Sequence, residues 1–137
     1  MTDRVADADA LLQAGRWQAA YYLAGYAIET ALKVRILQRL QSEPTVILEE
    51  GDRYVREVRS HNLLELLKRA GLAKQDASDG WIPDCADPMV IIQWKTARQW
   101  TEASRYERNV TERDARTLCT AILGSAELLT WITSQWN

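Results

Sequence analysis

The sequence contains few residues that break helices, since only six glycines and three prolines occur among its 137 residues. An all-β fold needs a turn every few residues, so this shortage argues against one. Phenylalanine is absent, and six tryptophans and five tyrosines supply the aromatic side chains. With 47% apolar and 26% charged residues the composition is that of a globular protein. The sequence therefore predicts one helical domain that spans residues 1–137.

Histidine and cysteine are also scarce. The single histidine, His61, and the separate Cys85 and Cys119 do not have the spacing of a zinc site, so neither a metal nor a cofactor is predicted. Two isolated thiols fit a reduced, cytoplasmic setting better than a disulfide framework. No run reaches eighteen apolar residues, and the N-terminus lacks the basic start and apolar centre of a secretory signal. We therefore expect neither a membrane span nor export.

The common catalytic motifs are missing as well: there is no glycine-rich phosphate loop, no GxSxG and no HExxH. The net charge of −2 gives the chain as a whole no attraction for nucleic acid. Arginines nevertheless gather in two stretches, at 53–59 and 98–116, where acidic residues interleave with them. These stretches indicate either helix faces with many salt bridges or a local basic patch that meets a phosphate.

What is present is helical periodicity. It predicts five helices, at about 3–14, 16–41, 62–70, 88–101 and 111–136. Gly15 and Gly71 are expected to end helices, whereas Asp87 and Thr111 are expected to begin them. The segment 74–86, rich in Asp, Ser and Gly, is expected to be a flexible loop. The predicted fold is all-α, an up-and-down bundle of four main helices plus a short accessory helix.

The predicted helix at 16–41 carries an unusual inner stripe. Tyrosines and two charged residues lie among its alanines and leucines, and a glycine lies near its middle; the residues concerned are Tyr21, Tyr22, Gly25, Tyr26, Glu29 and Lys33. Glycine costs about 1 kcal/mol relative to alanine inside a helix, so Gly25 predicts the close approach of another backbone. Glu29 and Lys33 have the favourable i, i+4 order, which predicts a solvated ion pair within the helix.

Three segments in this order resemble a known family. The long helix reads YLAGYAIETALK, with Ala27, Glu29, Leu32 and Lys33 as its core; HNLLELL follows from His61, and an Arg-Tyr pair, Arg105-Tyr106, comes later. Together they resemble the prokaryotic HEPN domain (higher eukaryotes and prokaryotes nucleotide-binding) over nearly the whole chain. The resemblance implies a homodimer that pairs with a minimal nucleotidyltransferase in a toxin–antitoxin-like system and meets a nucleotide or RNA. Trp81, in a segment with few apolar neighbours, is expected at an interface or beside a cleft.

Catalytic HEPN proteins cleave RNA without a metal, through an arginine followed after four to six residues by a histidine. No histidine follows Arg105 at that spacing, so the resemblance implies a non-catalytic binding module. A divergent ribonuclease that uses His61 with Arg56 or Arg105 is the alternative, and Arg56 has the required spacing. His61 is otherwise expected at a helix N-terminus, with its ring bonded to a carboxylate or a backbone group. A plain structural scaffold is a third possibility.

The region around Arg105 has two interpretations. Arg105, Tyr106, Arg108 and Lys33 are candidates to hold an anion such as a nucleotide phosphate near the start of the last helix. Alternatively, Arg105 forms a structural ion pair with Glu29 and ties the connection before the last helix to the long helix.

Overall fold

The computed structural model describes residues 2–42, 59–106, 109–123 and 127–136. These residues form six α-helices, one 3₁₀ helix and one two-stranded sheet, so the predicted helical class is confirmed and a small sheet is added to it. The elements are α1 (Thr2–Gln13), α2 (Trp17–Ser42), α4 (Leu63–Arg69), β1 (Ala73–Asp76), β2 (Gly80–Pro83), α5 (Pro88–Ala97), η1 (Glu102–Tyr106), α6 (Glu112–Thr120) and α7 (Leu128–Ser134). Among these helices, none is long and apolar enough to cross a membrane.

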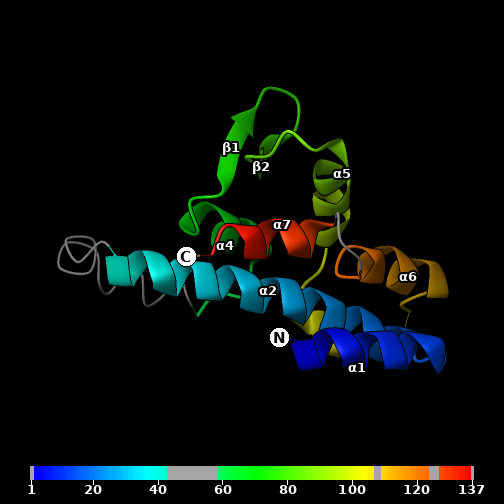
Figure 1. The fold of residues 1–137 in the computed structure, drawn as a ribbon. Helices are drawn as coiled ribbons and strands as arrows, with labels where there is room; N and C mark the ends of the chain where they lie inside the picture. Colours follow the sequence, from blue (N-terminus) through cyan, green and yellow to red (C-terminus); the bar gives the residue numbers. More distant parts are fainter. Residues whose placement is uncertain (1, 43–58, 107–108, 124–126, 137) are drawn as a thin grey trace.

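Helices α1 and α2 lie side by side and form the base of the molecule (Figure 1). Gly15 reverses the chain between them with φ +77°, a conformation that glycine adopts without the clash of a Cβ. The Arg16 amide donates to the Leu11 carbonyl at 2.9 Å, which closes the end of α1. Gly15 thus ends the first helix as predicted.

Helix α2 carries the largest part of the core. Helices α1, α4, α6, α7 and η1 all contact it. Its fully buried apolar residues follow one helical face: Ala20, Ala24, Ala27, Ile28, Ala31, Leu32 and Ile36. Small alanines on this face let the neighbouring elements come close to the helix axis. The shorter helices and the hairpin lie above this base (Figure 1).

Gly25 makes the closest of these approaches. A Cβ at this position would overlap atoms of the Trp100 indole ring, which is buried directly against α2. The predicted close approach is confirmed, but the neighbour is an indole ring and not a second backbone. Trp94 is buried like Trp100, and Trp17 and Trp136 are partly buried against the core.

The segment predicted as a flexible loop is instead largely an antiparallel hairpin. Strand β1 pairs with β2 so that Ala73 lies opposite Pro83 at one end and Asp76 lies opposite Gly80 at the other. The Asp76 carboxylate accepts from the amides of Ser78 and Asp79 at 3.2 and 3.0 Å, and Gly80 has φ +74°. These contacts fix a tight turn where composition alone indicated disorder. Trp81 in β2 is partly buried, with the Lys68 ammonium 5.0 Å from its ring centroid.

The predicted start signals of two helices are confirmed. Asp87 caps α5, since its carboxylate accepts from the Met89 amide at 2.9 Å, and Pro88 occupies the first turn. Thr111 and Asp114 form a reciprocal capping box at the start of α6. Helix α5 ends at Ala97, earlier than the predicted residue 101.

The prediction of one continuous last helix is wrong. Helix α6 ends at Thr120, and α7 begins only at Leu128. The residue before α7, Glu127, provides no side-chain cap; instead the buried Gln93 side chain of α5 accepts from the Leu128 amide at 2.7 Å. The amides at the start of a helix have no acceptor within the helix, and Gln93 supplies one for Leu128. The start of α7 is therefore stabilised by a residue distant in the sequence. Apolar side chains of this region still face the core, Ala115 and Leu118 on α6, Ile122 just after it, and Leu129 and Ile132 on α7.

Replacing Gln93 by leucine should lower the free energy of unfolding by about 1–3 kcal/mol, because the buried Leu128 amide then has no acceptor. Urea denaturation measures the change. Gln99→Leu serves as the matched control, since the Gln99 side chain is exposed and its bond to the Lys95 carbonyl is long, at 3.4 Å. A loss no larger than that of the control would contradict this role of Gln93.

Burial raises the pKa of the Cys119 thiol to about 11. In the unfolded chain the same thiol ionises near pH 8.5–9, so the folded state keeps its proton over a range where the unfolded state has lost it. The corresponding stability is fully present below about pH 8.5 and is lost as the pH rises to about 11, a change of roughly 2–3 kcal/mol. Comparing pH-dependent unfolding with that of Cys119→Ala isolates this contribution, because the variant should lack that part of the alkaline loss.

Candidate functional site

A buried carboxylate lies at the centre of the molecule. Glu29, on α2, is 1% exposed, although glutamate is almost never fully buried without partners. The predicted solvated pair with Lys33 is therefore corrected in one respect: the pair exists, with Nζ 3.7 Å from Oε2, but its acidic member is in the interior. Such a charge needs a stronger partner than an ammonium at that distance.

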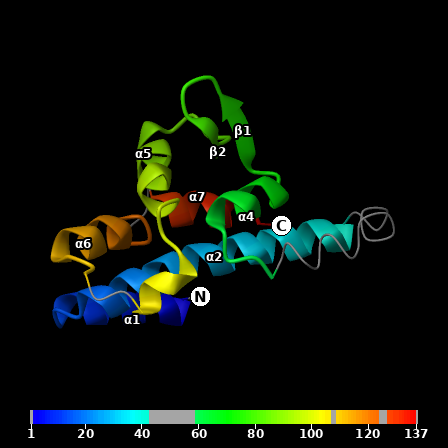
Figure 2. The ribbon, with the colours of Figure 1, turned by 180° about the vertical axis from the view of Figure 1, so that it is seen from behind.

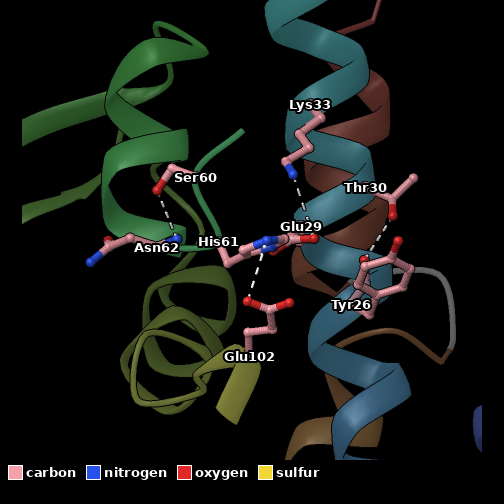
Figure 3. Close-up of polar contacts among 8 residues, drawn as sticks. All are labelled: Tyr26, Glu29, Thr30, Lys33, Ser60, His61, Asn62 and Glu102. Carbon is pink, nitrogen blue, oxygen red and sulfur yellow. Dashed lines mark hydrogen bonds and ion pairs between the residues drawn. The ribbon is translucent and has the colours of Figure 1, made fainter. Parts of the chain in front are cut away.

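His61 is that partner. Its Nδ1 lies 2.7 Å from the Glu29 Oε1, the shortest polar contact that either residue makes in the described part of the chain (Figure 3). The prediction that the ring bonds a carboxylate is confirmed. The contact joins residues 32 positions apart and fastens the segment before α4 to the middle of α2. It gives the Glu29 carboxylate a donor inside the core, where water cannot supply one.

Local structure places His61 at this point. Asn62 is the N-cap of α4, where its side chain accepts from the Glu65 amide at 3.0 Å. The Ser60 hydroxyl in turn accepts from the Asn62 amide at 3.0 Å. His61 lies between these two polar residues, so the start of α4 fixes its backbone and the ring reaches across to α2 (Figure 3).

A second carboxylate meets the other side of the ring. Glu102, the first residue of η1, has its Oε2 3.3 Å from His61 Nε2. Figure 2 shows η1 (yellow) and the segment that leads into α4 in front of α2. Both ring nitrogens therefore face carboxylate oxygens, Nδ1 at hydrogen-bond distance and Nε2 in a longer contact. His61 thus lies between two acidic side chains in this arrangement.

A cavity of about 330 Å³ opens beside this cluster. The residues that line it come from the start of α4, the end of α5 and η1: His61, Asn62, Leu63, Arg98, Trp100, Thr101, Glu102 and Ala103. Its walls combine an indole ring, a guanidinium, an imidazole and a carboxylate. Apolar surface with a few convergent polar groups is typical of small-molecule sites.

An aromatic row continues from the cavity along α2. The Tyr22 ring lies 6.0 Å from the Trp100 ring and stacks on Tyr26 at 5.9 Å, between ring centroids. The Arg4 guanidinium lies 3.9 Å from the Tyr26 centroid. The tyrosine stripe predicted on the inner face thus packs as a row that supports Trp100 from one side.

The other predicted site residues have different positions. Tyr106 is 75% exposed at the end of η1. The backbone of Arg105 belongs to η1, but its side chain, like Arg56 and Arg108, lies outside the described residues. The Glu29–Arg105 pair and the anion site at Arg105, Tyr106, Arg108 and Lys33 accordingly stay predictions.

Two functional candidates were not predicted from the sequence, Glu102 and Arg98. In the sequence both residues were noted only as part of the stretch 98–116, where arginines and acidic residues interleave. Nothing in their spacing indicates that they lie near His61. Among the described residues, no group of three or more histidine, cysteine, aspartate and glutamate side chains is arranged to hold a metal ion.

Comparison with known proteins returned no match, whether among protein-family models, curated proteins or solved structures.

Proposed function

We propose that the protein is a non-catalytic, HEPN-like helical module that binds a small ligand beside His61 and acts together with a second protein. The observation that carries this proposal is that both ring nitrogens of His61 face carboxylates. A histidine in this state anchors the structure and lines a cavity, whereas a general base needs a nitrogen that is free to take a proton.

The alternative is a ribonuclease that uses His61 with Arg56 or Arg105. In RNA cleavage the histidine must approach the 2′-hydroxyl next to a negatively charged phosphate. Glu102 lies 3.3 Å from the only nitrogen that does not face the buried Glu29. In this arrangement Nε2 faces a carboxylate and is not free to take the proton of a 2′-hydroxyl, which favours the binding module.

The cavity of about 330 Å³ supports the binding role, and a nucleotide is the ligand that the resemblance to HEPN domains implies. The proposal also includes the up-and-down arrangement of four main helices, the homodimer and the minimal nucleotidyltransferase partner that such modules have. Two exposed apolar side chains on α5 support a protein interface: Met89 is 49% exposed and Ile92 is 59% exposed. They lie three positions apart and so share one face of the helix.

Calorimetric titration with ATP tests ligand binding. We expect heat of binding from the wild type and none from Ala103→Trp, because the indole would fill the cavity beside His61. Ala77→Trp is the matched control, since Ala77 is exposed in the hairpin turn and should leave ATP binding unchanged. A second test is co-expression with a minimal nucleotidyltransferase, followed by purification of the complex. If no nucleotide binds and the nucleotidyltransferase does not co-purify, the proposal of a binding module fails and a scaffold role is left.

Incubation with single-stranded RNA tests the alternative. We expect no cleavage by the wild type, even at the protein concentration used in the ATP titration. Cleavage that disappears in His61→Gln would replace the binding module with the ribonuclease.

A further inference from the structure

His61 is held from its buried side. Glu29 accepts from Nδ1 at 2.7 Å, and the carboxylate is 1% exposed, so water cannot easily replace this contact. Lys33 adds a second cation, with its Nζ 3.7 Å from the other Glu29 oxygen. The ring orientation is therefore fixed, and Nε2 is the nitrogen left to face Glu102 and the cavity that both residues line.

The contact on that side is of a different kind. His61 Nε2 and Glu102 Oε2 are 3.3 Å apart, and their side chains are 42% and 45% exposed. Exposed ion pairs of this sort contribute only about 0–1 kcal/mol to stability. Glu102 is also the first residue of a short 3₁₀ helix, at its end and not inside it. A competing anion in the cavity therefore has little to displace.

We infer that the cavity is an anion site for a phosphate monoester, and that the Glu102 carboxylate occupies the position of the ligand's phosphate on His61. This inference rests on the proposed ligand-binding function and names the chemistry of its ligand. The bound phosphate accepts from His61 Nε2, which Glu29 already orients, and Glu102 moves out into solvent. Glu102 thus acts as an internal competitor that lowers the affinity of the resting protein.

Arg98 is a further basic residue in the lining of the same cavity. Its Nη1 lies 3.5 Å from the Asp79 carbonyl, a long contact that leaves most of the guanidinium fork available. Asp79 is itself paired with Lys95 at 2.9 Å, and that bond lowers the pKa of the Asp79 carboxyl. Arginine binds phosphate oxygens through two parallel hydrogen bonds, which a histidine alone cannot provide.

The balance of charge around the cavity supports the exchange. Among the described residues, the charged and titratable side chains that face His61 or line the cavity with it are Glu29, Glu102 and Arg98, and Lys33 pairs with Glu29 behind the ring. With Glu102 turned away, Lys33 and Glu29 balance each other, and the imidazolium and guanidinium give the cavity a positive charge. With Glu102 in place, one of these two positive charges is neutralised.

Titration with inorganic phosphate at pH 6 tests the inference. Glu102→Gln should bind phosphate about tenfold more tightly than the wild type, because the variant removes the competing charge and keeps the fold. His61→Gln and Arg98→Gln, each combined with Glu102→Gln, should each lose that gain. Glu112→Gln is the matched control, since the Glu112 side chain is exposed as well and pairs with Arg116 on α6, away from the cavity. Equal phosphate affinities of Glu102→Gln and the wild type would overturn the inference.

Two further measurements separate the possible sources of the phosphate and the two proposals. Adenosine monophosphate should show the same gain in Glu102→Gln if its phosphate binds there, whereas a gain for inorganic phosphate alone would restrict the ligand to the free ion. If Glu102→Gln shows no gain while Ala103→Trp still abolishes ATP binding, the inference fails and the proposed function stands.

Discussion

Replacing Gly25 by alanine should lower the free energy of unfolding by about 2 kcal/mol. The added Cβ would overlap the Cδ2, Cε2 and Nε1 atoms of the Trp100 indole, which is 2% exposed and has no room to move away. Overpacking of this kind typically costs about 1–3 kcal/mol and occasionally more. The better helix propensity of alanine returns about 1 kcal/mol, which does not offset a clash with so rigid a ring. Urea denaturation followed by circular dichroism measures the difference.

A double-mutant cycle shows whether Trp100 is the cause. Trp100→Leu removes the ring, so adding Gly25→Ala to that variant should cost nothing and can even stabilise it by the gain in helix propensity. Gln41→Ala, at an exposed position of α2, is the control for an alanine substitution in this helix. If the two mutations at Gly25 and Trp100 are additive, the contact does not explain the glycine.

The helix ends of this fold could be predicted because their chemistry is local. Gly15 and Gly71 stop helices with φ values of +77° and +72°, and Asp87 and Thr111 begin them through bonds to amides two or three residues later. Each signal needs only a few neighbouring residues, so the sequence displays it in full. These four helix boundaries could therefore be predicted from the amino-acid sequence alone.

The break between α6 and α7 and the hairpin could not be predicted in the same way. The amide of Leu128 is satisfied by Gln93, 35 positions earlier, and no local pattern announces that bond. The hairpin strands AKQD and GWIP have only four residues each and do not show the alternation of a half-buried strand. At the break the decisive contact comes from tertiary packing, whereas in the hairpin the strands are too short for their periodicity to be recognised.

The candidate site could likewise be predicted from the sequence only in part. His61 was expected at a helix start with its ring bonded to a carboxylate or a backbone group, and Glu29 was singled out by its place on the inner stripe. Their pairing and the approach of Glu102 depend on how α2, α4 and η1 come together, which spacing along the chain does not encode. The cavity is likewise a product of three separate segments.

The loss of His61 should be the other large effect. His61→Ala is expected to lower the free energy of unfolding by about 3 kcal/mol, because it leaves the Glu29 carboxylate buried with only Lys33, at 3.7 Å, as a charged partner among the described residues. Glu102→Gln removes the exposed contact to the same ring and should cost less than about 1 kcal/mol. Chemical denaturation of both variants gives the comparison.

Adding Glu29→Leu to His61→Ala should recover part of the lost stability, since the double variant no longer buries an unpaired charge. A cost for His61→Ala below that of Glu102→Gln would mean that the buried contact does not stabilise the fold. The expected pattern separates the two acids by their roles. Glu29 ties the ring to the core, so its loss affects folding, whereas Glu102 faces the cavity, so its loss changes anion affinity with little effect on stability. The depth at which each carboxylate is buried decides which of the two properties it controls.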